Sequence, residues 1–215
     1  MKISIAGANG SIAMLLHPLL KEKGHSIRGL IRNPEQKEEL KKAGAEPIIC
    51  DLEKEDDISS AVGDADVVIF AAGAGPGSGA ERKWTVDRDG AVKLIDAAKK
   101  NGIERYIMIS AMGLDTPRGD EVFRVYQKAK AEADEALRNS GLDYVIVKPG
   151  RLTDEPGKGK VQIGINLDSG RITRSDVAAV LSELVDSPEI KKVSFDLLEG
   201  EKEIEEVIKE LADNI

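Results

Sequence analysis

The chain has 215 residues and a formal net charge of −8. This length suits one compact domain with a large core, and the acidic balance argues against a nucleic-acid partner, because nucleic-acid-binding proteins gather Lys and Arg into a basic surface. No apolar stretch approaches the length of a membrane span and no secretory leader precedes the first predicted strand, so we expect a cytoplasmic protein without membrane contacts. Cys50, the single cysteine, lies in an apolar run and is expected to be a buried, inert thiol.

Short apolar runs alternate with amphipathic stretches along the first 150 residues. In chain order, the pattern predicts strands over 2–6, 26–31, 46–50, 66–71, 105–110 and 144–147, and helices over 12–23, 34–43, 55–62, 81–100 and 121–139. Strands that are apolar along their whole length are buried on both faces, which is typical of a parallel sheet between two layers of helices. The sequence therefore predicts a doubly wound α/β domain with about six to seven strands.

The last third of the chain is less regular. It predicts strands over 160–165 and 192–197 and helices over 175–185 and 202–212, with no linker that would separate a second domain. We expect one domain over 1–215, in which 150–200 form a small region on the substrate side.

The first strand runs into a G-x-x-G-x-x-A turn and a helix. Gly7 permits a tight turn, and Gly10 lets backbone N–H groups approach a pyrophosphate at the positive end of the helix. The turn thus predicts that Gly7, Asn9, Gly10, Ser11 and Ile12 bind a dinucleotide. A purely structural turn uses glycine for the same reason and stays open as the alternative.

Ligands of a doubly wound sheet lie beyond the carboxyl ends of its strands. Arg32 follows the second strand, where no carboxylate is present to bind a ribose 2′-hydroxyl, so Arg32 is predicted to bind the 2′-phosphate of NADP, with NAD the less favoured cofactor. An exposed surface arginine is the alternative. After the third strand, Asp51 and Leu52 are expected at the adenine, although Asp51 would equally suit a cap of the next turn.

The fourth and fifth strands also end in candidate residues. Ala71, Ala72 and Gly73 are small enough for their backbone to lie against the cofactor, and the glycine-rich residues 74–80 form either a loop that closes over substrate or a linker. Ser110 follows the fifth strand. Tyr126 and Lys130 are spaced i, i+4, so they lie on one face of the next helix.

The order of these parts resembles the short-chain dehydrogenase/reductase superfamily over about residues 1–185. The glycine-rich turn, Arg32, the segment Val145–Gly150 and the segment Arg171–Ala178 are similar to its small atypical members, described as NAD(P)-dependent epimerases or dehydratases. The resemblance implies a Rossmann fold, with Pro149, Gly150 and Leu152 along the nicotinamide.

The same resemblance implies a catalytic set. Tyr126 would exchange a proton with a substrate hydroxyl or carbonyl, Lys130 would lower the pKa of that phenol and bind the nicotinamide ribose, and Ser110 would hold the substrate oxygen. Asp87 stands where the superfamily carries an Asn. As an anion Asp87 accepts hydrogen bonds but cannot donate them, so a proton relay through this position would be altered.

Three functions are consistent with these residues. The first is an NADP-dependent oxidoreductase or epimerase for a small polar substrate, since the loops at 111–122 and 151–172 carry many charges and few aromatic residues. The alternatives are a non-catalytic NADP-binding redox sensor, suggested by Asp87, and a flavin or biliverdin-type reductase. Either a monomer or a homodimer is expected.

Other polar residues are predicted to have no role in the site. His17 and His25, the two histidines, have no metal-ligand spacing, so no metal is expected, and His17 is placed on the solvent side of the first helix. The Lys and Glu runs at 35–42, 53–57 and 199–210 are interpreted as solvated helix faces.

Overall fold

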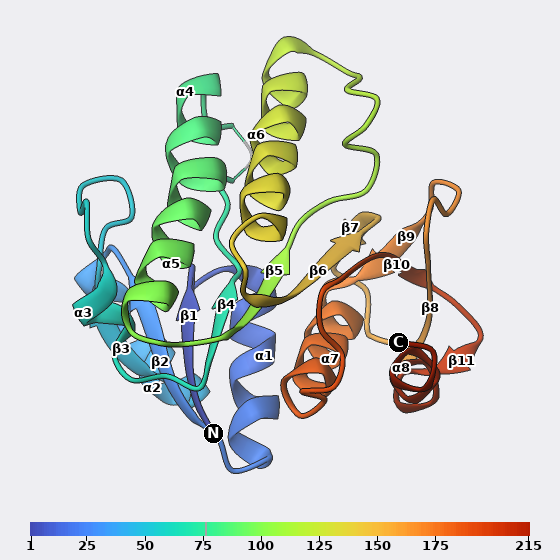
Figure 1. Ribbon diagram of the computed structural model, residues 1–215, viewed down its shortest axis with the longest axis horizontal. Helices are drawn as coiled ribbons and strands as arrows, with labels where there is room; N and C mark the ends of the chain where they lie inside the picture. Colours follow the sequence, from blue (N-terminus) through green and yellow to red (C-terminus); the bar gives the residue numbers. More distant parts are fainter. Residues whose placement is uncertain (76) are drawn as a thin grey trace.

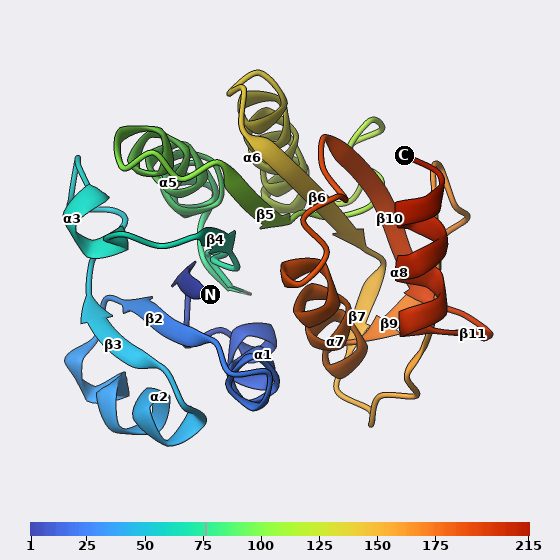
Figure 2. The same ribbon diagram turned by 60° about the horizontal axis from the view of Figure 1, so that its bottom comes forward.

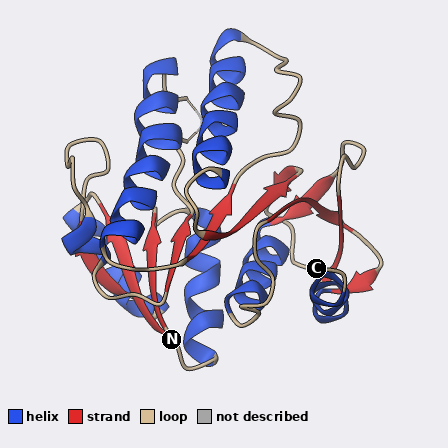
Figure 3. Ribbon diagram, in the orientation of Figure 1, coloured by secondary structure: helices blue, strands red, loops and turns tan. Residues whose placement is uncertain are grey.

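The computed structural model describes residues 1–75 and 77–215, and its centre is one twisted sheet (Figure 1, Figure 3). Within these residues, the main sheet has nine strands in the order β11-β8-β10-β6-β5-β4-β1-β2-β3. Seven run parallel: β1 (Lys2–Ala6), β2 (Ser26–Ile31), β3 (Glu46–Ile49), β4 (Val67–Phe70), β5 (Arg105–Ile109), β6 (Asp143–Pro149) and β10 (Val193–Glu199). The predicted doubly wound fold is confirmed.

The sheet is wider than expected at one edge. There β8 (Lys160–Gly164) pairs antiparallel with β10, and the short β11 (Lys202–Glu203) pairs antiparallel with β8. A separate parallel pair is made by β7 (Arg151–Thr153) and β9 (Arg171–Thr173). The antiparallel edge accounts for the difference between nine strands and the predicted six to seven.

Helices cover both faces of the sheet (Figure 2). One layer contains α3 (Ser59–Val62), α5 (Asp89–Lys100) and α6 (Glu121–Arg138), and the other contains α1 (Ser11–Glu22), α2 (Lys37–Ala43), α7 (Arg174–Val185) and α8 (Ile204–Asp213). Side chains of β4 alternate between two buried clusters: Val67 and Ile69 pack with α1 and α7, while Val68 and Phe70 pack with α5. No helix in the described part of the chain is both long and apolar enough to cross a membrane.

The helix predicted over 81–100 is interrupted. It begins with the single turn α4 (Ala80–Arg82), continues as the π-helical segment η2 (Lys83–Arg88) and becomes regular only in α5. Similarly, the helix expected over 55–62 is reduced to α3, and the stretch over 34–43 divides into the 3₁₀ turn η1 (Pro34–Gln36) and α2. Wide π turns occur frequently at functional sites. Pro76, in the predicted loop over 74–80, lies outside the described residues.

His17 is buried, not on the solvent side of α1, so that expectation is wrong. Its Nε2 atom lies 2.8 Å from the Ala8 carbonyl oxygen, which can only accept, so Nε2 carries the proton. Burial lowers the pKa of His17 and keeps the ring neutral. Through this hydrogen bond to Ala8, a neutral His17 links α1 to the glycine-rich turn that precedes it in the chain.

Candidate functional site

The carboxyl ends of the central strands meet at one edge of the sheet. Ala6 of β1 is in register with Leu30 of β2 and with Phe70 of β4, and Phe70 is in register with Met108 of β5. The chain leaves β1 for α1 on one face and leaves β4 for α5 on the other. A crevice for a ligand is expected at this reversal of direction.

The glycine-rich turn has the geometry of an anion cradle. Gly7 has φ +80°, and a Cβ atom there would lie 2.5 Å from the Ala72 Cα atom. Among the described residues no side chain caps α1, so the N–H groups of Ser11 and Ile12 are available to a ligand at the positive end of the helix. The Asn9 Oδ1 atom is buried without a partner in the described part of the chain. These features fit a pyrophosphate.

A cleft extends from this turn toward β2 and β3. Its lining contains most of the predicted cofactor residues: Gly7, Asn9, Gly10, Arg32, Asp51, Leu52, Ala71, Ala72 and Gly73. Asp51 caps the turn after β3, because its Oδ1 atom accepts a hydrogen bond from the Glu53 N–H at 3.0 Å. This is one of its two expected roles, and its contact with adenine stays a prediction. Cys50 is buried at the cleft wall, and burial raises the pKa of its thiol to about 12.

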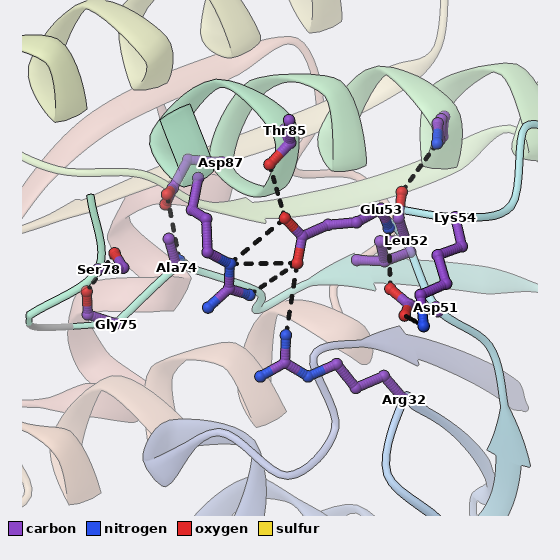
Figure 4. A network of polar contacts seen from close by, with 12 residues as sticks. Arg32, Asp51, Leu52, Glu53, Lys54, Ala74, Gly75, Ser78, Thr85 and Asp87 are labelled. Carbon is purple, nitrogen blue, oxygen red and sulfur yellow. Dashed lines mark hydrogen bonds and ion pairs between the residues drawn. The ribbon is translucent and has the colours of Figure 1, made fainter. Parts of the chain in front are cut away.

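Glu53 is a polar centre of this cleft that sequence reasoning missed (Figure 4). The expectation of a solvated helix face over 53–57 is wrong here, since Glu53 lies outside any helix and accepts hydrogen bonds from Arg82 and Thr85. The Arg82 guanidinium holds the pKa of Glu53 below its usual range, with the Thr85 hydroxyl acting in the same direction against the effect of burial. Its position two residues after Asp51, at a strand end, was the available signal.

The predicted catalytic residues gather beyond β4 and β5. Lys130 is buried on α6, donates to the Ile109 carbonyl oxygen at 3.1 Å and lies 3.7 Å from the Asp87 Oδ1 atom. Asp87, on η2, accepts from the Ala74 N–H at 3.1 Å. Burial lowers the pKa of Lys130, and the Asp87 carboxylate opposes that shift. Asp87 thus supplies a counter-charge that an Asn would not.

Tyr126 lies one helical turn before Lys130 and is half-buried. Its ring stacks on Phe123 with centroids 5.7 Å apart, and the Lys83 Nζ atom lies 5.6 Å from its ring centroid. Burial, and then the carboxylate of Asp87, raises the pKa of Tyr126 above its ordinary value. Burial and the carboxylates of Asp87 and Asp134 raise this pKa, opposite to the lowering expected from Lys130.

Ser110 is buried beside a second residue that sequence reasoning missed, Asp134. In the described residues, the Ser110 hydroxyl and both Asp134 carboxylate oxygens have no hydrogen-bond partner. Burial raises the pKa of Asp134, while the nearby cations Lys148 and Arg138 oppose the shift. The spacing i, i+4 between Lys130 and Asp134, which places both on one face of α6, was the signal that could have revealed it.

We expect Asp134 to make stability depend on pH. Because its folded pKa is raised, the unfolded chain ionises first as the pH rises above about 4, and the folded state loses stability until the folded pKa is passed. The Asp134→Asn variant lacks this loss. Urea unfolding of both proteins between pH 4 and 8 should show wild type losing up to about 1.4 kcal/mol per pH unit relative to the variant within that window. A difference that is constant across this range would contradict the raised pKa.

The residues predicted along the nicotinamide lie beyond Ser110, on the side away from the cleft that Arg32 lines. Pro149 ends β6, and its carbonyl oxygen accepts from the Met112 N–H at 3.2 Å. The Gly150 N–H donates to the Leu197 carbonyl oxygen at 3.0 Å, and Leu152 lies on β7. Pro149, Gly150 and Leu152 do not line the cleft that contains Arg32. This is expected if they contact the nicotinamide end of a dinucleotide whose adenine end lies in that cleft. In the described residues no three His, Cys, Asp or Glu side chains gather as metal ligands.

A glycine-rich turn at the point where a doubly wound sheet reverses direction defines a dinucleotide-binding protein. The family model described as NAD(P)H-binding matches residues 7–188. The chain therefore belongs to this NAD(P)H-binding family.

Individual relatives are similar over almost the whole chain. The uncharacterized sugar epimerase YhfK of Bacillus subtilis is 40% identical over 214 residues, which are 98% of this chain and 100% of YhfK. A solved Bacillus halodurans structure, named as a candidate NAD-dependent epimerase/dehydratase, is 41% identical with a TM-score of 0.92, over 98% of this chain and 99% of its own. The anaerobillin reductase ChuY of Escherichia coli O157:H7 is 25% identical with a TM-score of 0.76, over 94% of this chain and 99% of ChuY.

Proposed function

We propose that this protein is a cytoplasmic NADP-dependent oxidoreductase or epimerase that acts on a small polar substrate at Tyr126. The observation that carries the proposal is the buried Lys130–Asp87 pair one helical turn from Tyr126, at the same sheet edge as the glycine-rich turn. The similarity to proteins named as an epimerase and as reductases supports the same reaction class.

Residues of this chain would hold the cofactor along the sheet edge. The N–H groups of Ser11 and Ile12 would bind the pyrophosphate, Asp51 and Leu52 would lie at the adenine, and Lys130 would reach the nicotinamide ribose. The backbone at Ala71–Gly73 and at Pro149–Leu152 would lie along the dinucleotide. Bound NADPH supplies a hydride to a carbonyl carbon.

The raised pKa of Tyr126 keeps the phenol in its protonated form, which is the form that can act as a proton donor. At neutral pH the phenol is protonated, so it can donate its proton to a substrate oxygen as a carbonyl is reduced. The Ser110 hydroxyl, which has no hydrogen-bond partner among the described residues, would hold that oxygen. Turnover of NADPH with a panel of small aldehydes, ketones and nucleotide sugars tests the proposal, and a panel without any Tyr126-dependent turnover would reject it.

Arg32 is the proposed ligand of the 2′-phosphate. Its side chain is exposed at the mouth of the cleft, where a guanidinium can bind a phosphate. Trp84, on η2, is the only tryptophan, so a change in protein emission on titration with nucleotide can be assigned to it. We expect NADPH to bind more tightly than NADH, and Arg32→Gln to weaken NADPH alone by about ten- to a hundredfold, as for loss of a charged hydrogen bond.

Lys37→Gln is the matched control for Arg32→Gln, because Lys37 is a cation on α2 outside the cleft lining. This variant should leave both Kd values unchanged. Equal binding of NADPH and NADH by the wild-type protein would contradict the proposed role of Arg32.

Two specific observations favour other functions. The similarity to ChuY favours a reductase of flavin or bilin type, which would reduce free flavin with NADPH equally well after Tyr126→Phe. The identity of Asp87, a carboxylate that cannot donate a hydrogen bond to a proton relay as an Asn would, favours a redox sensor. A sensor would bind NADP and NADPH with different affinities and turn over no substrate of the panel.

A further inference from the structure

Glu53 contacts two arginines at the end of the cleft assigned to the 2′-phosphate (Figure 4). Its Oε2 atom lies 2.8 Å from Arg82 Nη2 and 3.4 Å from Arg32 Nη1. Its Oε1 atom accepts from the Thr85 hydroxyl at 2.7 Å. One carboxylate thus lies between two guanidinium groups, and these three side chains together carry one net positive charge.

The two arginines are bound unequally. Arg82 directs both Nε and Nη2 at the carboxylate, and Thr85 from the same helical stretch adds a third donor, so Glu53 is fixed from that side. Arg32 makes a single long contact, and 56% of its side chain is exposed. Arg32 is therefore the partner that can leave Glu53 at little cost.

We propose that Glu53 is a specificity-determining residue, which competes with the cofactor 2′-phosphate for Arg32 and so limits the preference for NADP over NAD. The inference rests on the proposed binding of NADP by Arg32. Binding of a 2′-phosphate requires Arg32 to exchange Glu53 for the phosphate, and it brings a second anion near a fixed carboxylate. A cofactor that carries a 2′-hydroxyl meets neither cost. Arg82 reduces the repulsion, because it neutralises Glu53 and holds it on the η2 side.

The experiment uses two nucleotide fragments that differ in one phosphate, 2′,5′-ADP and 5′-AMP, measured by calorimetry on the whole chain. We expect Glu53→Gln to tighten 2′,5′-ADP by about three- to tenfold and to change 5′-AMP by less than about twofold. The gain should disappear in the Arg32→Gln background, because Glu53 acts through Arg32. Glu35→Gln, which removes an exposed carboxylate three residues after Arg32, should change neither Kd.

A second variant, Arg82→Gln, has an expected effect of opposite sign and tests the inference if Glu53→Gln folds poorly. Arg82→Gln leaves Glu53 un-neutralised and free to bind Arg32, so it should weaken 2′,5′-ADP and spare 5′-AMP. In combination with Glu53→Gln, the Arg82 substitution should have no further effect, since its effect passes through the carboxylate.

Three results would overturn the inference. They are a Glu53→Gln variant that binds 2′,5′-ADP no better than wild type, one that improves both fragments alike, and an Arg82→Gln effect that persists without the carboxylate. If the wild type binds the two fragments equally and Arg32→Gln changes neither, the proposed NADP site fails together with this inference. If Arg32→Gln strongly weakens 2′,5′-ADP while Glu53→Gln leaves its Kd unchanged, this inference is rejected and the proposed NADP site stands.

Discussion

Tyr126→Phe is expected to lower kcat for carbonyl reduction by about 10²- to 10⁴-fold, the usual contribution of a positioned proton donor. The substitution removes only the hydroxyl, so the ring can keep its stack on Phe123, and the Lys130–Asp87 pair is unaffected. The Kd for NADPH, followed through Trp84, should change by less than about twofold, because the loss concerns the transition state.

Tyr144→Phe provides the matched control. Tyr144 is partly buried near the amino end of β6, at the opposite sheet edge from Ser110, so loss of its hydroxyl should leave kcat unchanged. The raised pKa also predicts that the wild-type reduction rate stays level up to about pH 10, the ordinary pKa of a tyrosine. Unchanged turnover by Tyr126→Phe would show that another group donates the proton.

Gly7→Ala is expected to have the largest effect on stability, about 2–5 kcal/mol. A left-handed backbone costs a non-glycine residue about 1–2 kcal/mol, and overpacking costs about 1–3 kcal/mol more. At this position a Cβ atom would lie 2.5 Å from the Ala72 Cα atom and 2.6 Å from its N atom, so backbone must move. The variant should unfold at a lower urea concentration and lose NADPH binding.

Gly24→Ala separates the two causes of this loss. Gly24 has nearly the same φ, +79° against +80° at Gly7, but a Cβ atom there would meet nothing within 4 Å. Its cost should stay at about 1–2 kcal/mol, with NADPH binding unchanged. Equal destabilisation by the two alanines would mean that the approach of Ala72 to the glycine-rich turn is unimportant.

The arrangement of the sheet could be predicted because the relevant signals are local. Uninterrupted apolar runs such as Val67–Phe70 reveal strands buried on both faces. Once the strand order of a doubly wound sheet is assumed, the residues that follow each strand must share one edge. For that reason Gly7, Arg32, Asp51 and Ala72, each predicted to contact the cofactor, line one cleft, while their contacts with a cofactor stay predictions.

Sequence position could point to Glu53 and Asp134, but the partners of Glu53, Asp134 and His17 could not be predicted, because the fold brings them near. Glu53 lies 29 residues from Arg82 in the chain, and its charge resembles that of any solvated turn. Asp134 differs from the exposed carboxylates of α6 only in its burial beside Ser110. The burial of His17 could not be predicted either, because an amphipathic pattern is compatible with a polar residue at the boundary of the apolar face.

The π-helical winding of η2 determines how two side chains of the site are oriented. Thr85 and Asp87, two residues apart on it, contact groups at opposite ends of the proposed dinucleotide, Glu53 and Lys130. An α-helix advances about 100° per residue, so a deletion that restored regular winding would rotate one of these side chains away from its partner. The π-helical winding of η2 therefore sets the angle between Thr85 and Asp87, and a relative with the same residues on a regular α-helix would not place them alike.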